Sequence, residues 1–308
     1  MAELEAAARG KVERARAAGE VAGEETVEHL YRDLLLLELK EWFKNDFFSW
    51  VDKPACEGCG GETEGGGPVA PTAQEQGEGA GRVEGYRCRG CGGEVRFPRY
   101  HGRPEVLLRT RRGRCGEWAN CFVLCCRALG FDTRMVVDWT DHVWAEVWSA
   151  AEGRWLHVDP GEAVDATLVY EVGWGKQLTY CIAASRDEVQ DVTWRYSRDH
   201  RATRGRRALV RPAWLTATLL ALSSSQQVAY TTEERERLTR RRVAECLELL
   251  TAREAREGDR QGRRTGAMAW RLARGELGEQ GAGHTFRPTL QEREEGMVVV
   301  QYCVVRNR

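Results

Sequence analysis

The sequence lacks an excess of charge of either sign. Its 308 residues include 46 Lys and Arg and 47 Asp and Glu, which leaves a formal net charge of −1. A protein without a net positive field has no overall attraction to the phosphates of nucleic acids or to an anionic membrane surface. We therefore expect neither nucleic acid nor membrane as a partner, and a neutral substrate fits better.

Long apolar runs and a secretory leader pattern are also missing. No stretch approaches the ~20 apolar residues that a membrane-spanning helix needs, and the chain opens on a charged segment from Met1 to Thr26. These absences predict a soluble protein of the cytoplasm, with the nucleus as a further compartment. We find no internal repeat, and the 42% hydrophobic content is enough for a packed globular core.

Cysteine is abundant, but its arrangement does not favour a disulfide framework. The chain has eleven cysteines, an odd number. Four of them form two Cys-x-x-Cys pairs, each followed by glycine, at Cys56, Cys59, Cys88 and Cys91. Two such pairs can present four thiolates tetrahedrally, as structural zinc prefers, with no open position for chemistry. Structural zinc is therefore the predicted cofactor, and two disulfides or four unrelated thiols are the alternatives.

The residues between and before these pairs differ in composition. Residues 60–85 are dense in Gly and Glu and poor in large apolar side chains, which predicts a flexible loop. Over 26–52 apolar residues recur at helical spacing, which predicts an amphipathic helix. Residues 1–23 predict a solvated helix or a disordered lead-in, and the Arg-rich run 96–114 is interpreted as a solvated loop.

Strand-forming residues dominate the middle of the chain. After Gly130, which predicts a helix end, three segments rich in Val and Trp should form an antiparallel meander over 131–138, 142–149 and 154–159. The further predicted elements are strands over 179–185 and 188–196 and helices over 214–222 and 233–256. Beyond Gly275 the pattern predicts little.

Cys115 is the candidate nucleophile. It follows Gly113 and directly precedes a predicted helix over 117–129. The N–H groups and the dipole at a helix N-terminus stabilise an anion, so we expect the pKa of this thiol to fall. Three other cysteines lie within the helix and are interpreted as small buried apolar residues: Cys121, Cys125 and Cys126.

His142 and Asp159 complete a candidate triad. A tight hairpin that pairs Ser149 with Arg154 would set Asp159 opposite Trp144 and diagonal to His142 on the same face of the sheet. A carboxylate placed there can fix the tautomer of the imidazole and stabilise its protonated form.

His157 is the competing histidine. It shares the face of Asp159 but lies opposite Glu146, further from the strand end. We interpret it as structural.

Four segments together resemble cytosolic peptide:N-glycanases of the transglutaminase-like superfamily, whose core is similar to that of papain-type cysteine proteases. These segments are 112–120, 140–144, 173–176 and 187–196. The likeness runs from about Leu34 to Tyr196, and more weakly through 270–276. It implies an α+β fold with a nucleophile-bearing helix packed on an antiparallel sheet, a zinc-knuckle subdomain and flanking helices. The expected divisions are a helical segment 1–52, a zinc-binding subdomain 53–100, a catalytic core 101–200 and a C-terminal helical region 201–308.

The resemblance also implies residue roles. The nucleophile, histidine and aspartate of the family match Cys115, His142 and Asp159. The residues that hold the first two sugars match Trp50, Glu162 and Trp174 together with the histidine, although core packing is the alternative for both tryptophans. The sequence departs from the family at two points. Gly161 stands where its members usually carry a cysteine, and the segment 162–165 is one residue shorter than usual, which puts the placement of Glu162 in question.

The implied activity is hydrolysis of the amide between an asparagine side chain and the first N-acetylglucosamine of an N-glycan, through a thioester that leaves aspartate. Denatured glycoproteins would be the substrates, within glycoprotein quality control and ER-associated degradation, and ubiquitin-receptor shuttle proteins of the proteasome would dock on terminal helices. The alternatives are a protein-crosslinking transglutaminase or a cysteine protease that uses the same triad, and a non-enzymatic scaffold that binds partners or damaged DNA.

Overall fold

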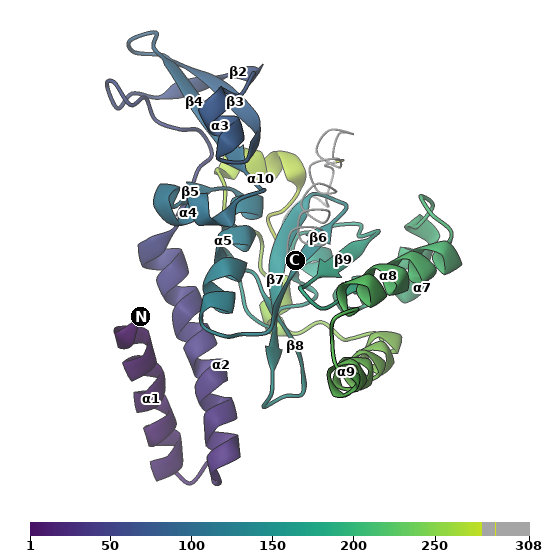
Figure 1. Cartoon of the computed structure of the whole chain (residues 1–308). Helices are drawn as coiled ribbons and strands as arrows, with labels where there is room; N and C mark the ends of the chain where they lie inside the picture. Colours follow the sequence, from purple (N-terminus) through teal and green to yellow (C-terminus); the bar gives the residue numbers. More distant parts are fainter. Residues whose placement is uncertain (279–286, 288–308) are drawn as a thin grey trace.

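A five-stranded antiparallel sheet lies at the centre of the molecule (Figure 1). The computed structural model describes residues 1–278 and Arg287. The strand order is β10-β9-β6-β7-β8. The bounds are β6 Thr133–Asp138, β7 His142–Ser149, β8 Arg154–Val158, β9 Cys181–Ala184 and β10 Val189–Asp191. Helices flank this sheet, and the α+β architecture expected from the sequence is confirmed.

The predicted meander is confirmed in register as well as in order. Ser149 pairs with Arg154 across the hairpin, and Glu146 pairs with His157. The two later strands are shorter than predicted. The second of them ends at Asp191, whose carboxylate accepts hydrogen bonds from the backbone N–H and the hydroxyl of Thr193, and a 3-10 turn follows over Thr193–Tyr196.

The central sheet is covered on both faces, so its strands alternate between two apolar clusters. Val143, Ala145 and Val147 face α5 (Cys115–Ala128), and α2 (Glu24–Trp42) joins the same cluster. Trp144 points the other way, toward α6 (Val169–Val172) and the loop after it. The two-residue period of a strand produces this division, and it places His142 on the aromatic face with Trp144.

Two helices form the N-terminal part. Residues Ala2–Ala17 form α1, which packs along α2 and buries Ala8 and Val12. The helix predicted over 26–52 ends at Trp42, because a π-helical turn follows over Phe43–Phe47. Strand β1 (Ser49–Trp50) then pairs in parallel with β5 (Arg112–Gly113). Trp50 is thereby fixed opposite Gly113, two residues before the candidate nucleophile.

The prediction of a flexible loop over 60–85 is wrong. This stretch contains β2 (Thr63–Val69), α3 (Ala73–Gly77) and most of β3 (Ala80–Cys88), and β4 (Glu94–Tyr100) completes a three-stranded sheet. The glycines permit close packing instead of loosening the chain: a Cβ at Gly85 would lie 2.7 Å from Val69 Cγ1. The Gly- and Glu-rich composition of residues 60–85 therefore did not indicate the two closely packed strands β2 and β3.

The Arg-rich run 96–114 is not a solvated loop either. It forms part of β4, helix α4 (Pro104–Thr110) and β5, and the Arg99 side chain is buried. The remaining elements are α7 His200–Arg206, α8 Pro212–Gln226, α9 Thr232–Leu250, a 3-10 turn Glu257–Arg260 and α10 Met268–Arg274. Helix α9 ends six residues before its predicted end. The part of the predicted C-terminal region 201–308 that follows residue 278 lies, apart from Arg287, outside the described residues.

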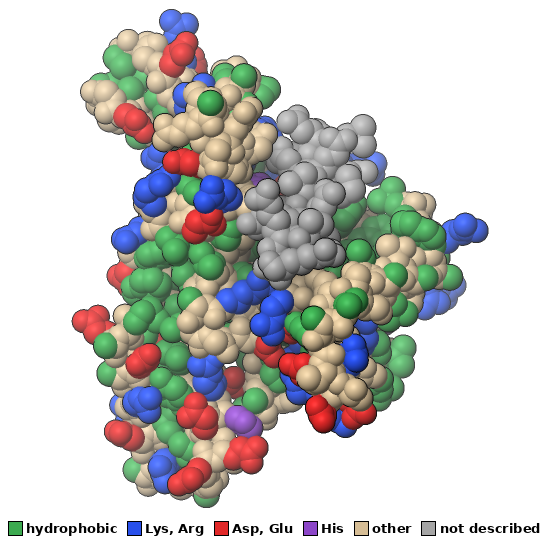
Figure 2. Space-filling model, viewed as in Figure 1, with side chains coloured by type: hydrophobic (Ala, Val, Ile, Leu, Met, Phe, Trp, Pro, Cys, Tyr) green, Lys and Arg blue, Asp and Glu red, His purple; other side chains and the backbone are tan. Residues whose placement is uncertain are grey.

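Charges of both signs are interspersed over the visible surface (Figure 2). Inside the protein, Arg134 of β6 and Arg195 bind the carboxylate of Glu146 on β7 at 2.5 and 2.7 Å, and both also bind Glu245 of α9. This buried network joins α9 to the central sheet.

Within the described part of the chain, no helix is both long and apolar enough to cross a membrane.

Candidate active site and metal centre

Cys115 is the first residue of α5, and a buried carboxylate in the next turn fixes that end of the helix. Glu117 accepts hydrogen bonds from Arg99 Nε at 2.7 Å and from the backbone N–H of Arg114 at 2.9 Å, and it contacts His101 Nε2 at 2.8 Å. Because Arg99 and His101 belong to β4 or follow it directly, the three-stranded sheet that carries the cysteine cluster is tied to the nucleophile's helix.

Just before this helix, the backbone at Gly113 lies close to the side chain of Glu117. A Cβ there would lie 2.3 Å from Glu117 Cβ, so a side chain at this position would displace Glu117. Gly113 also pairs with Trp50 through β5 and β1. The sequence Arg-Gly-Arg-Cys-Gly-Glu therefore positions the nucleophile through one glycine and one carboxylate.

His142 and Asp159 lie in direct contact. The imidazole Nε2 is 2.7 Å from Asp159 Oδ2, and both side chains are almost fully buried. The other ring nitrogen, Nδ1, is buried without a hydrogen-bond partner among the described residues. With Nε2–H donated to the carboxylate, Nδ1 carries a free lone pair and can accept a proton.

Tyr170 completes this arrangement and was not predicted. Its hydroxyl is 3.1 Å from Asp159 Oδ2 and 2.7 Å from His157 Nε2. Because Asp159 also contacts His142, this hydroxyl and the Asp159 carboxylate together connect His157 to His142. His157 is fully buried behind it. This histidine supports Asp159 through Tyr170, and its burial lowers its pKa to about 4.

Gly161 brings the nucleophile's helix and Asp159 together. A Cβ at this position would lie 3.8 Å from Trp118 Cε3, in the first turn of α5, and 3.7 Å from Asp159 Oδ1. It would also lie only 2.9 Å from Thr265 Cγ2, which leaves little room for the cysteine usual in the family. Helix α5 and strand β7 also pack against each other, so the elements that carry the three candidate residues converge.

The predicted fall in the pKa of Cys115 is wrong. Burial and the carboxylate of Asp141 raise the pKa of this thiol, although Arg263 opposes them. A helix N-terminus supplies only about half a positive charge, which is less than burial of a thiolate demands. Burial also lowers the pKa of His142 well below its usual range, with a further contribution from Arg263. The resting pair is therefore a neutral thiol and a neutral imidazole.

Two tryptophans among the predicted sugar-binding residues lie close to the triad. The ring of Trp174 is 4.8 Å from that of His142 at 61°, and it is fully buried. Trp50 is partly exposed, and its Nε1 donates to Asp52 Oδ1 at 2.9 Å. Trp174 packs in the aromatic cluster of the central sheet, whereas Trp50 lies at the edge of the nucleophile's cluster.

Glu162 is held by a segment that the sequence did not connect to it. Its Oε1 accepts from the backbone N–H of Thr265 at 2.8 Å and from the Thr265 hydroxyl, and its Oε2 accepts from the backbone N–H of Arg264 at 2.8 Å. Burial raises the pKa of Glu162, and the nearby Asp159 raises it further.

Arg263 was missed by the sequence analysis. Its guanidinium stacks 4.8 Å from the Trp174 ring centroid and 4.5 Å from that of Trp270, and its Nη1 donates to Glu276 at 2.9 Å. The same cation acts on the thiol of Cys115 and on the ring of His142. Arg263 lies seven residues before the segment 270–276 that extends the resemblance, and no local pattern in the sequence singles it out.

The other cysteines of α5 are packed as expected. Cys121 and Cys126 are buried, and Cys125 is half-buried. Burial raises the pKa of Cys126 well above its usual range.

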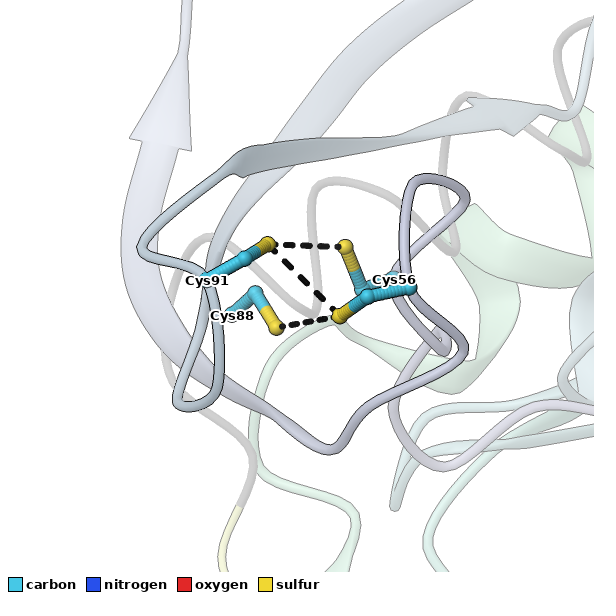
Figure 3. Close-up of side chains that lie close together, drawn as sticks. Cys56, Cys88 and Cys91 are labelled. Atoms are coloured by element: carbon cyan, nitrogen blue, oxygen red, sulfur yellow. Dashed lines mark hydrogen bonds between the residues drawn. The ribbon is translucent and has the colours of Figure 1, made fainter.

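Four sulfur atoms form the candidate metal centre (Figure 3). Sγ of Cys56 is 3.6 Å from that of Cys91, and Sγ of Cys59 is 3.4 Å from that of Cys88. All four lie within 4.8 Å of one another. A tetrahedron with Zn–S bonds of ~2.3 Å has edges of ~3.8 Å, so the donor set fits a metal ion of this kind. The four cysteines can thus hold a metal ion, as the spacing predicted.

Comparison with known families supports the resemblance. Residues 68–160 match the transglutaminase-like superfamily, and residues 139–240 match the Rad4 transglutaminase-like domain. The chain is 49% identical over 278 residues to a peptide-N(4)-(N-acetyl-beta-glucosaminyl)asparagine amidase of Gallus gallus, which covers 89% of this chain and 42% of that protein. The amidase of the same name from Homo sapiens is 46% identical over 90% of this chain and 42% of its own length.

More distant relatives and solved structures extend the comparison. The amidase of Drosophila melanogaster is 41% identical over 83% of this chain and 38% of its own length. A crystal structure of Rad4-Rad23 bound to a 6-4 photoproduct UV lesion has a TM-score of 0.36 and 16% identity over 70% of this chain and 48% of that one. The chain carries a transglutaminase-like domain, and it spans about two fifths of the length of the curated amidases it matches. The resemblance to these amidases is confirmed.

Proposed function

We propose that this protein is an amidase that releases N-glycans by hydrolysing the bond between the asparagine side chain and the first N-acetylglucosamine. The observation that carries the proposal is the buried His142–Asp159 pair beside the nucleophile's helix, in a chain 46–49% identical to proteins named for this activity. Denatured glycoproteins are the proposed substrates.

The first chemical step is attack by Cys115 on the side-chain carbonyl. Because thiol and imidazole rest in their neutral forms, His142 Nδ1 takes the thiol proton as the sulfur–carbon bond forms. Asp159, which accepts from Nε2, stabilises the resulting imidazolium. His142 then gives this proton to the leaving nitrogen, the carbon–nitrogen bond breaks, and a 1-amino glycan departs.

Water completes the reaction. His142 accepts a proton from water as the oxygen attacks the thioester, and the thiol of Cys115 is restored. The asparagine becomes aspartate, and the sum is one amide and one water converted to one carboxylic acid and one glycosylamine.

Trp50, Trp174 and Glu162 are the proposed sugar-binding residues, together with His142. Aromatic rings suit the apolar faces of pyranose rings, and a carboxylate accepts hydrogen bonds from hydroxyls. Among the described residues, Oε2 of Glu162 accepts one hydrogen bond, from the backbone N–H of Arg264, so it keeps capacity for one sugar hydroxyl.

We propose that the metal ion is zinc with a structural role. Four thiolates satisfy tetrahedral zinc completely and leave no position for substrate. Zinc would hold Cys56, Cys59, Cys88 and Cys91 and thereby stabilise the three-stranded sheet. Elemental analysis should find about one zinc per chain, and clearly substoichiometric zinc with full activity would contradict this role.

We also propose a setting for the activity. The protein would act in the cytoplasm, with the nucleus as a second compartment, on misfolded glycoproteins destined for degradation. Ubiquitin-receptor shuttle proteins would dock on its terminal helices. Co-purification with such a receptor, lost when residues 1–17 are removed, would support this arrangement, and unchanged co-purification would contradict it.

The test is glycan release from a denatured N-glycoprotein in H2(18)O. We expect free glycan and conversion of asparagine to aspartate with one heavy oxygen at the glycosylation site, measured by peptide mass spectrometry. Cys115→Ala should abolish both, whereas Cys125→Ala, in the same helix but away from its N-terminus, should retain them. Retention of activity by Cys115→Ala would overturn the mechanism.

The same preparation separates the alternatives. A transglutaminase would incorporate a labelled amine into a glutamine substrate, and a protease would cleave the peptide backbone. A non-enzymatic scaffold would leave the glycoprotein unchanged. Any of these results without glycan release would replace the proposed function.

A further inference from the structure

The segment 270–276 contacts the proposed sugar-binding residue Trp50 at one end and the residue before His142 at the other. It consists of α10 and the two residues after it. The backbone N–H of Ala267, just before α10, donates to Asp52 at 3.0 Å, and the ring of Trp270 is 6.5 Å from that of Trp50. Helix α10 therefore begins against the segment that carries Trp50 (Figure 1).

A buried carboxylate holds two arginines at the other end of the motif. Glu276 is fully buried, and its two oxygens accept from Arg263 Nη1 and from Arg274 Nε, each at 2.9 Å. Burial alone would raise the pKa of Glu276, but the two guanidinium groups lower it to about 2. The carboxylate is thus ionised throughout the neutral range, and it anchors both cations.

Arg274 reaches from this anchor to the residue directly before His142. Its Nη1 donates to the carboxylate of Asp141 at 2.9 Å, and its Nη2 lies 3.3 Å from the carbonyl oxygen of the same residue. Lys176 Nζ lies 3.3 Å from that carbonyl as well. Two cations therefore converge on the peptide group that joins Asp141 to His142.

Asp141 needs such support because of its backbone conformation. Its φ is +69°, in the left-handed region that side chains other than glycine, asparagine and aspartate rarely adopt. The turn from Asp138 to Asp141 connects β6 to β7, and its exit fixes the direction in which the His142 side chain leaves the strand. A rotation at Asp141 would displace the imidazole from Asp159.

We propose that Arg274 is a positioning residue for the base His142, acting through Asp141 and anchored by Glu276. This inference rests on the proposed function only for its kinetic consequences. Arg274 belongs to α10, whose Trp270 ring lies near the ring of the proposed sugar-binding residue Trp50. Residues 270–276 therefore connect the segment that carries Trp50 to Asp141, the residue before His142.

Kinetics of three variants test this role. Arg274→Met removes the donors, Asp141→Asn removes the charge of the acceptor while keeping a residue that tolerates positive φ, and the double variant combines them. We expect each single variant to lower kcat about 10- to 100-fold with KM within about two-fold, because a displaced base slows chemistry more than binding. The double variant should lose no more than the worse single variant.

Two further variants test whether a fall in kcat reflects loss of folding. Glu276→Gln leaves Arg274 in place but weakens its anchor, and Arg274→Lys keeps the charge with fewer donors. Both should lose less kcat than Arg274→Met. Arg274→Lys should unfold within a few degrees of the wild type, whereas Glu276→Gln should also lower the unfolding temperature, because it leaves two buried arginines short of one negative charge. Multiplicative losses in the double variant, or an increase in KM at unchanged kcat, would overturn the proposal.

A measurement without substrate separates this proposal from the proposed function. In protein labelled with 15N-histidine, the wild-type His142 ring should show a protonated Nε2 and an unprotonated Nδ1 at neutral pH. Arg274→Met should shift these resonances, whereas the His157 resonances should stay unchanged. Unchanged His142 resonances would refute the positioning role, even if the wild type released no glycan.

Discussion

The cysteine-rich subdomain, residues 53–100, and the central sheet are built on opposite principles. Beside its candidate metal centre the subdomain buries a small cluster, in which two of five members are cysteines of that centre: Cys56, Tyr86, Cys88, Val95 and Phe97. The central sheet buries an extended apolar cluster on each face. A small core rarely supplies enough burial to fold independently, whereas a sheet covered on both faces does. The three candidate triad residues lie on or directly beside elements of the part with the larger core.

The two regions also treat charge differently. Arg134 and Glu146 meet inside the protein with no exposed side-chain surface, whereas Arg89 and Glu64 of the subdomain pair with 59% and 58% of their side chains exposed. A buried pair is costly to break because one uncompensated charge remains, and an exposed pair contributes little.

The largest expected effect is on the subdomain. Removal of the metal with a strong chelator, or Cys88→Ser, should unfold residues 53–100, because structural zinc commonly contributes about 10–16 kcal/mol of apparent binding free energy. Hydrogen exchange should show loss of protection in β2 to β4 with β6 and β7 still protected. Equal loss of protection in both regions would contradict their independence.

The buried network should give the next effect. Glu146→Gln leaves Arg134 and Arg195 short of one negative charge, and we expect the free energy of unfolding to fall by about 3–5 kcal/mol in denaturant titration. Glu64→Gln, the matched change in an exposed pair, should cost less than about 1 kcal/mol. Similar costs for the two variants would refute the contrast.

The pH dependence of stability distinguishes the regions further. His157 has a folded-state pKa of about 4, below the usual value of 6.5, so the unfolded chain binds its proton first as pH falls. The neutral form of His157 therefore contributes to the free energy of unfolding fully above pH ~6.5. This contribution of about 3 kcal/mol is lost as the pH falls from ~6.5 to ~4. The slope of unfolding free energy against pH should flatten in His157→Gln. An unchanged slope would assign the effect to other groups.

The smallest expected effect concerns Tyr170. Tyr170→Phe removes the hydroxyl shared by Asp159 and His157 while keeping the ring between Trp144 and Trp174. We expect a loss of about 1–2 kcal/mol in unfolding free energy and about a tenfold fall in kcat, measured at saturating glycoprotein concentration over a range of pH. A loss of stability without any change in kcat would limit Tyr170 to packing.

Local patterns predicted much of the catalytic region. Alternation along the strands and the hairpin length fixed the pairing of Ser149 with Arg154, and this register brings Asp159 to His142. The spacing of the cysteine pairs predicted the cluster of four sulfur atoms. These features depend on residues close in sequence, for which periodicity and spacing are sufficient.

Long-range packing explains what could not be predicted. The glycines of 60–85 indicated a loop, but strand pairing uses them for close approach, as Gly85 against Val69 shows. Arg263 reaches the site from about 120 residues beyond His142 in the chain, and no local pattern connects the two. The pKa of Cys115 was wrongly predicted because the burial of a thiol is a property of the whole fold.

The most direct test of the central claim is to trap the intermediate. A reaction with a denatured glycopeptide is quenched in acid within milliseconds, digested with a protease active at low pH, and examined by mass spectrometry. The account predicts an aspartyl thioester that joins the substrate peptide to the fragment containing Cys115, and no such adduct in Cys115→Ala. Continued glycan release with no adduct, or with the adduct on Cys125, would contradict it.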